Sequence, residues 1–346
     1  MSDRTTMGGK PVFTVPALSV INFKSGFAEK LLCDGPTFSA GTSCTFSCAF
    51  CFVPSQMRKQ QPWLAAHGVT GKHEDVVVRR ENAVDIVRRQ LTDAKGQPKF
   101  TDPDDRRVIY ASPLVDVAGN MELVRETVEI CKVILTLTNW HIRLLSKSNL
   151  LPKVAKALTA WACEGGVTHP SWSWSGNGAH RCPSSRVIYG VSTGTLDDNL
   201  ARAFEQGTPL VSKRIESLHW LQDNGYRTFG MVCPSLPQTA YHRFAANMAS
   251  ALRYDQCEHV WAEVINTRGD SFTRTHAALE SNGFYGSAAA LELVSTDKEE
   301  WEKYARLTFE AHTSVCPPGK LRFLQYVTND TRPWWEAQRE NGAVIL

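Results

Sequence analysis

The sequence lacks a long apolar run and has little net charge. No stretch of about 18 apolar residues occurs, so we expect no membrane-spanning helix and no membrane partner. The net charge of +3 neither requires nor excludes a nucleic-acid partner. The start, MSDRTTMGGK, is polar and lacks the apolar stretch of a signal peptide. We therefore expect a loose tail there and a cytoplasmic protein.

The composition is that of a globular enzyme with reduced thiols. Hydrophobic residues make up 42% and charged residues 21% of the 346 positions, enough for a sizeable core. Ten cysteines occur without a secretory signal, so free thiols are expected rather than disulfides. Most of them fit a packed interior. Cys131, for example, falls on an apolar helical stripe with Val124, Val128 and Leu135.

Short apolar runs alternate with helical patterns over most of the chain. The predicted strands are 37–42, 107–111, 141–145, 186–191, 228–232 and 259–265. The predicted helices are 81–94, 121–136, 151–161, 196–206, 211–224 and 241–253, followed by 287–293 and 297–313 in a less regular tail. Such alternation predicts an α/β fold with a parallel sheet, either open or curled into a barrel. A Gly- and Ser-rich stretch at 164–185, with Trp172 and Trp174, is either a binding loop or an ordered insertion.

Three cysteines stand apart by their spacing. Cys44, Cys48 and Cys51 follow the pattern C-x3-C-x2-C directly after the first predicted strand. Thiolates suit iron–sulfur clusters, and three of them leave one iron of a [4Fe–4S] cubane open for a substrate or cofactor. A structural zinc site needs four ligands, and the nearby histidines His67 and His73 complete no compact zinc pattern. No fourth cysteine follows at a ferredoxin spacing, which favours a catalytic [4Fe–4S] cluster.

This loop resembles the signature of the radical S-adenosylmethionine (SAM) superfamily. Phe50 fills the aromatic position of that signature, which in the family lies near the adenine of SAM. The resemblance implies a partial (β/α)6 TIM-type barrel of the radical SAM type, with an irregular, mostly helical C-terminal extension. It also implies reductive cleavage of SAM to a 5′-deoxyadenosyl radical that abstracts hydrogen from a substrate. The implied cofactors are a [4Fe–4S] cluster and SAM, and the implied electron donor is a flavodoxin or ferredoxin.

Three further segments resemble the spore photolyase-like (DNA repair photolyase-like) branch. They are residues 110–116, residues 145–148, and residues 189–197 followed by 214–218 and Gly225. By this resemblance Ser112, Lys147 and Ser192 are candidates for contacts to SAM, each at the carboxyl end of a predicted strand. The implied division is an N-terminal arm (1–35), a radical SAM partial barrel (36–265), and an extension covering the barrel (266–346).

The chain also departs from that branch. Spore photolyase has tyrosines around the last cluster cysteine, where this chain has Phe50 and Phe52. It has a donor cysteine at the second strand end, where this chain has Ala111 or Ser112. The usual tyrosine–cysteine relay is therefore not expected. Cys233, at the end of the fifth predicted strand, is a substitute hydrogen donor or a packed core thiol.

Three functions fit these observations. The first is a radical SAM enzyme of lyase or isomerase type. Its substrate would be a thymine-type nucleobase in DNA or a nucleotide, isomerised or modified rather than simply repaired. The second is a radical SAM enzyme acting on a peptide or small metabolite, although the tail holds only Cys316 after Cys257 and so offers no auxiliary cluster. The third is a non-enzymatic Fe–S nucleic-acid-binding protein that stacks tryptophans on bases.

Overall fold

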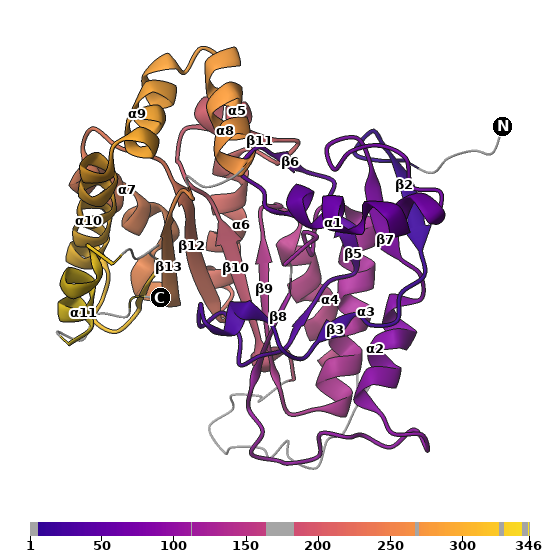
Figure 1. The fold of residues 1–346 in the computed structure, drawn as a ribbon. Helices are drawn as coiled ribbons and strands as arrows, with labels where there is room; N and C mark the ends of the chain where they lie inside the picture. Colours follow the sequence, from indigo (N-terminus) through magenta and orange to yellow (C-terminus); the bar gives the residue numbers. More distant parts are fainter. Residues whose placement is uncertain are drawn as a thin grey trace. The chain divides into compact units, whose positions relative to one another are not determined.

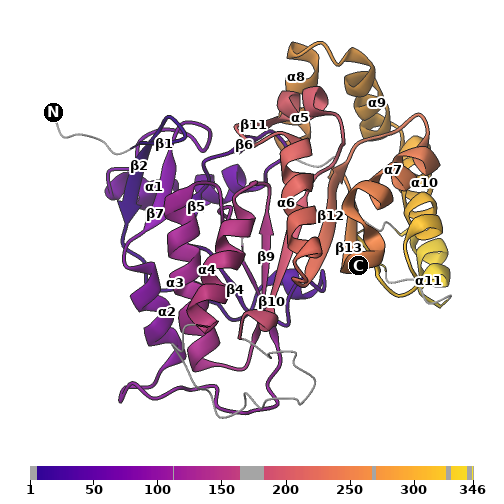
Figure 2. The same ribbon diagram turned by 180° about the vertical axis from the view of Figure 1, so that it is seen from behind.

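The structure is a computed structural model that describes residues 6–111, 113–163, 183–266, 270–324, 329–340 and 345. Its chain contacts divide into two compact units (Figures 1 and 2). Unit 1 comprises residues 1–46, 53–190 and 223–227, and unit 2 comprises residues 47–52, 191–222 and 228–346. The predicted lid-like stretch at 164–185, with both of its tryptophans, lies almost wholly outside the described residues.

Unit 1 contains a mostly parallel sheet covered by helices. Its strand order is β10-β9-β8-β4-β3, with β4, β8 and β9 parallel and β3 antiparallel at the edge. These strands are β3 (Ile21–Asn22), β4 (Thr37–Phe38), β8 (Val108–Ala111), β9 (His141–Ser146) and the start of β10 (Val187–Ser192). The helices α2 (Ala83–Leu91), α3 (Met121–Leu137) and α4 (Leu151–Cys163) pack in that order side by side. Two 3-10 turns complete this part, η1 (Gly26–Ala28) and η2 (Pro183–Arg186).

Helix α3 illustrates why these segments form. The Asn120 side chain caps it by accepting hydrogen bonds from the amides of Glu122 and Leu123. Its apolar stripe, which includes Cys131, is buried as the sequence predicts. At the other end Arg186 donates to the carbonyls of Leu135 and Thr138, which satisfies acceptors that the helix leaves open. Capping and burial together therefore set the bounds of α3.

A second, smaller sheet in unit 1 was not predicted. Its order is β1-β2-β7-β5, formed by β1 (Thr6–Met7), β2 (Lys10–Val15), β7 (Val77–Arg80) and β5 (Gly41–Ser43). Strand β2 pairs parallel with β7, so the expectation of a loose tail is wrong from residue 6 onward. Helix α1 (Val53–Ala66), which has Pro62 inside it, was also missed because its sequence has a weak apolar stripe.

The predicted first strand, 37–42, is two strands in different sheets. Thr37–Phe38 pairs parallel with β8, whereas Gly41–Ser43 pairs antiparallel with β7. The chain changes sheets at Gly41, where a Cβ atom would lie 2.4 Å from the carbonyl oxygen of Val78. Only glycine permits this approach. Strand β5 leads directly into Cys44, so its pairing with β7 positions the start of the cysteine loop.

Unit 2 repeats the strand–helix alternation. Its sheet order is β14-β13-β12-β10, with β12 (Thr228–Ser235), β13 (Cys257–Val264) and β14 (Leu321–Leu324) all parallel. A two-stranded ribbon joins β6 (Ser47–Cys48) to β11 (Glu205–Gln206). The helical elements are α5 (Asp198–Phe204), α6 (Val211–Asp223), α7 (Tyr241–Leu252), η3 (Tyr254–Gln256), α8 (Asp270–Ser281), α9 (Tyr285–Thr296), α10 (Lys298–Val315) and α11 (Arg332–Glu340).

The predicted α/β class is confirmed, since the six predicted helices before the tail are present and most predicted strands are parallel neighbours. The two predicted tail helices are α9 and α10, with α10 packed on α7 and β13. The tail also contributes β14 to the sheet, which its irregular pattern did not reveal. Within the described part of the chain, no helix combines the length and apolar character needed to cross a membrane.

Candidate functional site

The first cysteine of the loop is held by unit 1. Cys44 follows β5 and is buried, and the amide of Phe46 donates to its Sγ at 3.5 Å. Lys10 Nζ lies 3.4 Å from the carbonyl oxygen of Cys44 and 3.3 Å from that of Phe46. Just before Cys44, the Ser43 hydroxyl donates to the carbonyl of Val76 at 2.9 Å. The backbone around Cys44 is therefore fixed by β2 and β7, which the sequence analysis did not foresee.

The other two cysteines belong to unit 2. Cys48 lies opposite Glu205 in the β6–β11 ribbon, and the amide of Ala49 donates to the carbonyl of Phe204 at 2.8 Å. The amide of Cys51 donates to the carbonyl of Cys48 at 3.1 Å, which closes a tight turn. Cys48 is buried and Cys51 is half-buried. The turn thus brings two thiol-bearing residues into one short, hydrogen-bonded segment.

Phe50, the candidate adenine neighbour, lies within this turn. Its ring is 5.7 Å from that of Phe204, centroid to centroid, with the planes inclined by 59°. The ring is half-buried, so one part of it packs on α5 and another is accessible. Phe52, where spore photolyase has a second tyrosine, is 45% exposed. Neither ring carries a hydroxyl.

The donor set of the loop fits a [4Fe–4S] cluster. None of the three cysteines forms a disulfide, and soft thiolates are the ligands such clusters take. The N–H···S contact to Cys44 is of the kind that tunes cluster potentials. Among the described residues, no group of three His, Cys, Asp or Glu side chains is arranged to hold a metal ion. Ligation by Cys44, Cys48 and Cys51 therefore stays a prediction from spacing and chemistry.

Lys147 is positioned by a buried carboxylate that spans two strand ends of unit 1. Asp116 accepts hydrogen bonds from the Ser146 hydroxyl at 2.7 Å, the Lys147 amide at 2.8 Å and the Ala118 amide at 2.8 Å. Burial raises the pKa of Asp116, and the three hydrogen bonds oppose that rise. The structure thus joins two of the segments that carried the family resemblance, 110–116 and 145–148.

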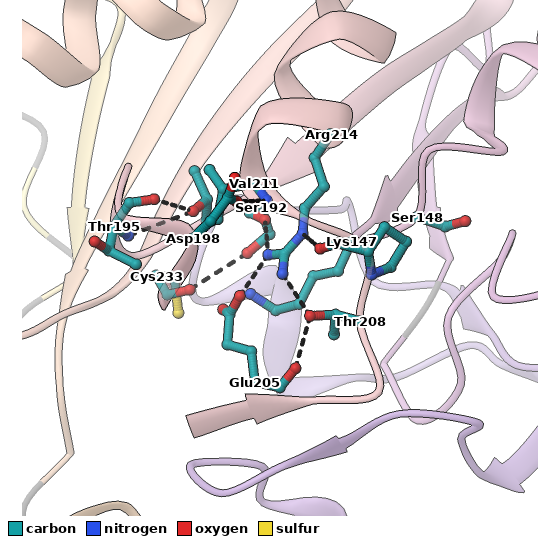
Figure 3. Close-up of polar contacts among 12 residues, drawn as sticks. Lys147, Ser148, Ser192, Thr195, Asp198, Glu205, Thr208, Val211, Arg214 and Cys233 are labelled. Carbon is teal, nitrogen blue, oxygen red and sulfur yellow. Dashed lines mark hydrogen bonds and ion pairs between the residues drawn. The ribbon is translucent and has the colours of Figure 1, made fainter. Parts of the chain in front are cut away.

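Ser192 lies at the end of β10 beside a buried ion pair in unit 2. Arg214 donates from Nη1 to Glu205 Oε2 at 2.5 Å and to the Ser192 carbonyl at 3.3 Å (Figure 3). Its Nη2 reaches the Thr208 hydroxyl at 2.5 Å, and its Nε reaches the Pro209 carbonyl at 2.9 Å. Both charged side chains are fully buried, with an exposed fraction of 0%. One guanidinium therefore ties the end of β10 to the ribbon that carries Cys48.

The turn after Ser192 also approaches β12 closely. A Cβ atom on Gly194 would lie 1.9 Å from the Pro234 carbonyl oxygen, so only glycine fits. The Ser192 hydroxyl, at the end of β10, donates to the carbonyl of Cys233 in β12 at 3.3 Å (Figure 3). Sequence reasoning found Ser192 but missed Glu205. The available signal was a lone arginine in the apolar face of a predicted helix, which requires an acidic partner.

Cys233 is paired with a carboxylate rather than packed among apolar side chains alone. Its Sγ donates to Glu263 Oε2 at 3.1 Å, joining β12 to β13, and the thiol is half-buried. Tyr304 of α10 is fully buried against the ends of β12 and β13. Its hydroxyl donates to the Ser235 carbonyl and accepts from the Ile265 amide. Burial raises the pKa of Tyr304 well above its ordinary value. The remaining candidate, Ser112, lies outside the described residues.

Strands that alternate with helices in a mostly parallel sheet, with the cysteine loop ahead of them, give the chain the fold of radical SAM partial-barrel proteins. One solved protein with a similar fold is spore photoproduct lyase. Its complex with dinucleoside spore photoproduct matches at a TM-score of 0.51 and 12% identity, covering 84% of this chain and 76% of that chain. A mutant of this lyase with bound AdoMet and dinucleoside spore photoproduct matches at a TM-score of 0.51 and 12% identity. The match covers 85% of this chain and 77% of that chain.

A cysteine-to-serine mutant of the same lyase gives a TM-score of 0.52 at 12% identity, covering 84% of this chain and 76% of that chain. The partial-barrel prediction is thereby confirmed at the level of the fold. No protein-family model matches the sequence, and no curated protein matches it significantly.

Proposed function

We propose that the protein is a radical SAM enzyme that acts on a thymine-type nucleobase in DNA or a nucleotide. The observation that carries the proposal is the C-x3-C-x2-C loop, whose cysteines form no disulfide, in a chain with the fold of spore photoproduct lyase. That lyase has been solved with bound AdoMet and dinucleoside spore photoproduct, which supports both the cofactor and the substrate class. The electron would come from a flavodoxin or ferredoxin.

In this proposal Cys44, Cys48 and Cys51 hold a [4Fe–4S] cluster. When bound, the cluster supplies the electron that cleaves SAM to methionine and a 5′-deoxyadenosyl radical. Phe50 borders the adenine with its accessible edge, while its other side packs on Phe204. The buried ion pair of Arg214 and Glu205 keeps the Cys48 ribbon in place.

Two groups would orient SAM. Lys147 provides a point charge for the methionyl carboxylate, and the bond from its amide to Asp116 fixes where its side chain leaves the strand end. Ser192, with Ser112, would contact the remainder of the cofactor. The Ser192 hydroxyl now bonded to the Cys233 carbonyl can also accept a hydrogen bond, because a hydroxyl donates one and accepts two.

The reaction is proposed to be an isomerisation or modification rather than simple reversal of a photoproduct. Phenylalanine at positions 50 and 52 cannot relay a phenolic hydrogen atom. Cys233 is the candidate donor, because its S–H is half-buried and held by the carboxylate of Glu263. Where no donor acts, the hydrogen returns to the product from 5′-deoxyadenosine.

The test is anaerobic. The protein is reconstituted with iron and sulfide, reduced, and given SAM with or without thymine-containing DNA, and 5′-deoxyadenosine is quantified. We expect its formation to rise with DNA, and deuterium from labelled thymine methyl groups to enter it. A full cluster that cleaves SAM equally well without DNA, and takes up no label, would contradict the nucleobase assignment. A full cluster with no cleavage at all would contradict the enzyme.

A further inference from the structure

Helix α8, far along the chain from the cysteine loop, makes a direct contact with the third cysteine. Arg274 Nη2 donates to the carbonyl oxygen of Cys51 at 2.5 Å, although the two residues are 223 positions apart. The Nε of the same side chain donates to the carbonyl of Asp270 at 3.2 Å, in the first turn of α8. Two nitrogen atoms of the guanidinium, Nη2 and Nε, therefore make hydrogen bonds, which fixes the position of the group next to Cys51.

The helix that carries Arg274 is itself anchored to the cysteine ribbon. Helix α8 packs against α5 and α9 within unit 2, and α5 runs directly into β11. Figures 1 and 2 show α8, α5, β11 and β6 gathered at one end of this unit. Since β11 pairs with β6 across Glu205 and Cys48, the same group of elements contacts both cysteines of unit 2.

We propose that Arg274 is a positioning residue for the cluster. It fixes the backbone of Cys51 and places a permanent positive charge at the carbonyl group of this third cysteine. This inference rests on the proposed function. An arginine stays protonated under all relevant conditions, so its charge does not depend on pH. The reduction potential of an iron–sulfur cluster depends on nearby charge and on hydrogen bonds, and a cation favours the more negative reduced state.

The charge and the hydrogen bond can be separated by substitution. Arg274→Gln removes the charge and shortens the side chain, whereas Arg274→Lys keeps the charge without the planar fork. Arg243, exposed on α7 in the same unit, provides the matched control, because Arg243→Gln makes the same change of net charge away from the loop. A role limited to folding would leave the potential of correctly loaded protein unchanged.

The experiment reconstitutes the full-length protein and these variants anaerobically with iron and sulfide, and measures iron content before activity. The cluster midpoint potential is then measured by EPR-monitored redox titration. For Arg274→Gln we expect the ratio of reduced to oxidised cluster at a fixed potential to fall about tenfold, a shift of about 59 mV for one electron. Arg274→Lys should retain most of the wild-type potential, and Arg243→Gln all of it.

An unchanged potential in Arg274→Gln, or an equal shift in Arg243→Gln, overturns the inference and leaves the proposed function intact. If Arg274→Gln takes up no iron, Arg274→Lys decides the question. Normal iron content and potential in that variant support the inference, and loss of iron in both variants overturns it. Wild-type protein that takes up no cluster is a different result, since it overturns the proposed function and the inference together.

Discussion

At the scale of single residues, Asp116 shows how a buried charge serves the site without touching a ligand. Its carboxylate is satisfied by one hydroxyl and two amides, which offsets the cost of burial. Two of these donors, from Ser146 and Lys147, lie at the end of β9. In the proposed function, where Lys147 binds SAM, the carboxylate would act on the cofactor through the backbone of Lys147.

The first prediction concerns this carboxylate. Asp116→Asn turns one acceptor into a donor that faces an N–H or O–H group. We expect a loss of about 1–3 kcal/mol in the free energy of unfolding, because a buried donor loses its partner. SAM affinity should fall as well. Urea unfolding and SAM titration check both effects. Asp104→Asn, at an exposed position, is the control and should change neither quantity.

A second residue makes stability depend on pH. Burial lowers the pKa of His312 from its ordinary 6.5 to about 4, and its Nδ1 contacts the Tyr254 hydroxyl at 3.2 Å. Between these two values the unfolded chain binds a proton that the folded chain does not. The free energy of unfolding therefore falls as the pH is lowered from 6.5 towards 4, by roughly 3 kcal/mol.

His312→Gln should remove this part of the acid sensitivity, whatever its effect at neutral pH. Urea unfolding of the cluster-free protein at several pH values between 4 and 7 measures the slope for each variant. His67→Gln changes an exposed histidine and should leave the slope as it is. Equal slopes for His312→Gln and wild type would contradict a lowered pKa of His312 in the folded state.

At the scale of elements, the β6–β11 ribbon depends on the ion pair beneath it. Glu205 contributes its backbone to the ribbon and its side chain to Arg214. Breaking a fully buried pair leaves an unpaired charge, so we expect Glu205→Gln to cost about 3–5 kcal/mol in the free energy of unfolding. Glu216 offers the contrast, since it pairs with Lys213 at 2.8 Å on the surface, where both side chains are more than half exposed.

Glu216→Gln should cost no more than about 1 kcal/mol in the same urea unfolding measurement, because exposed pairs are screened by solvent. Glu205→Gln should also lower the iron content after reconstitution, whereas Glu216→Gln should not. Equal stability of the Glu205→Gln and Glu216→Gln proteins would show that the β6–β11 ribbon does not depend on the ion pair of Arg214 and Glu205.

The same elements explain what sequence reasoning could reach. Strands 107–111 and 141–145 were predicted closely, because their apolar runs are local signals bounded by polar turns. The change of sheet at Gly41 was not predicted, because it depends on contact with β7, more than thirty residues further along the chain. Lys10, Glu205 and Arg274 were missed for the same reason. Each acts on the cysteine loop through pairing or packing that no short-range pattern records.

At the scale of the whole molecule, the chain shares a fold with spore photoproduct lyase at 12% identity. So distant a likeness shows the shared fold and does not by itself identify the substrate. In the resemblance drawn from the sequence, Phe50, Phe52 and Ala111 or Ser112 stand where that branch has its tyrosines and its donor cysteine. In the proposed function, the chemistry depends first on the loop of Cys44, Cys48 and Cys51.

The last prediction tests that loop directly. Cys44→Ala, Cys48→Ala and Cys51→Ala should each lower iron content and abolish the formation of 5′-deoxyadenosine from SAM, because three thiolates are needed to hold the cluster. Cys163→Ala is the matched control, since this cysteine is exposed at the end of α4. It should bind iron and cleave SAM like the wild type. Full SAM cleavage by any one of the three loop variants would exclude that cysteine as a ligand.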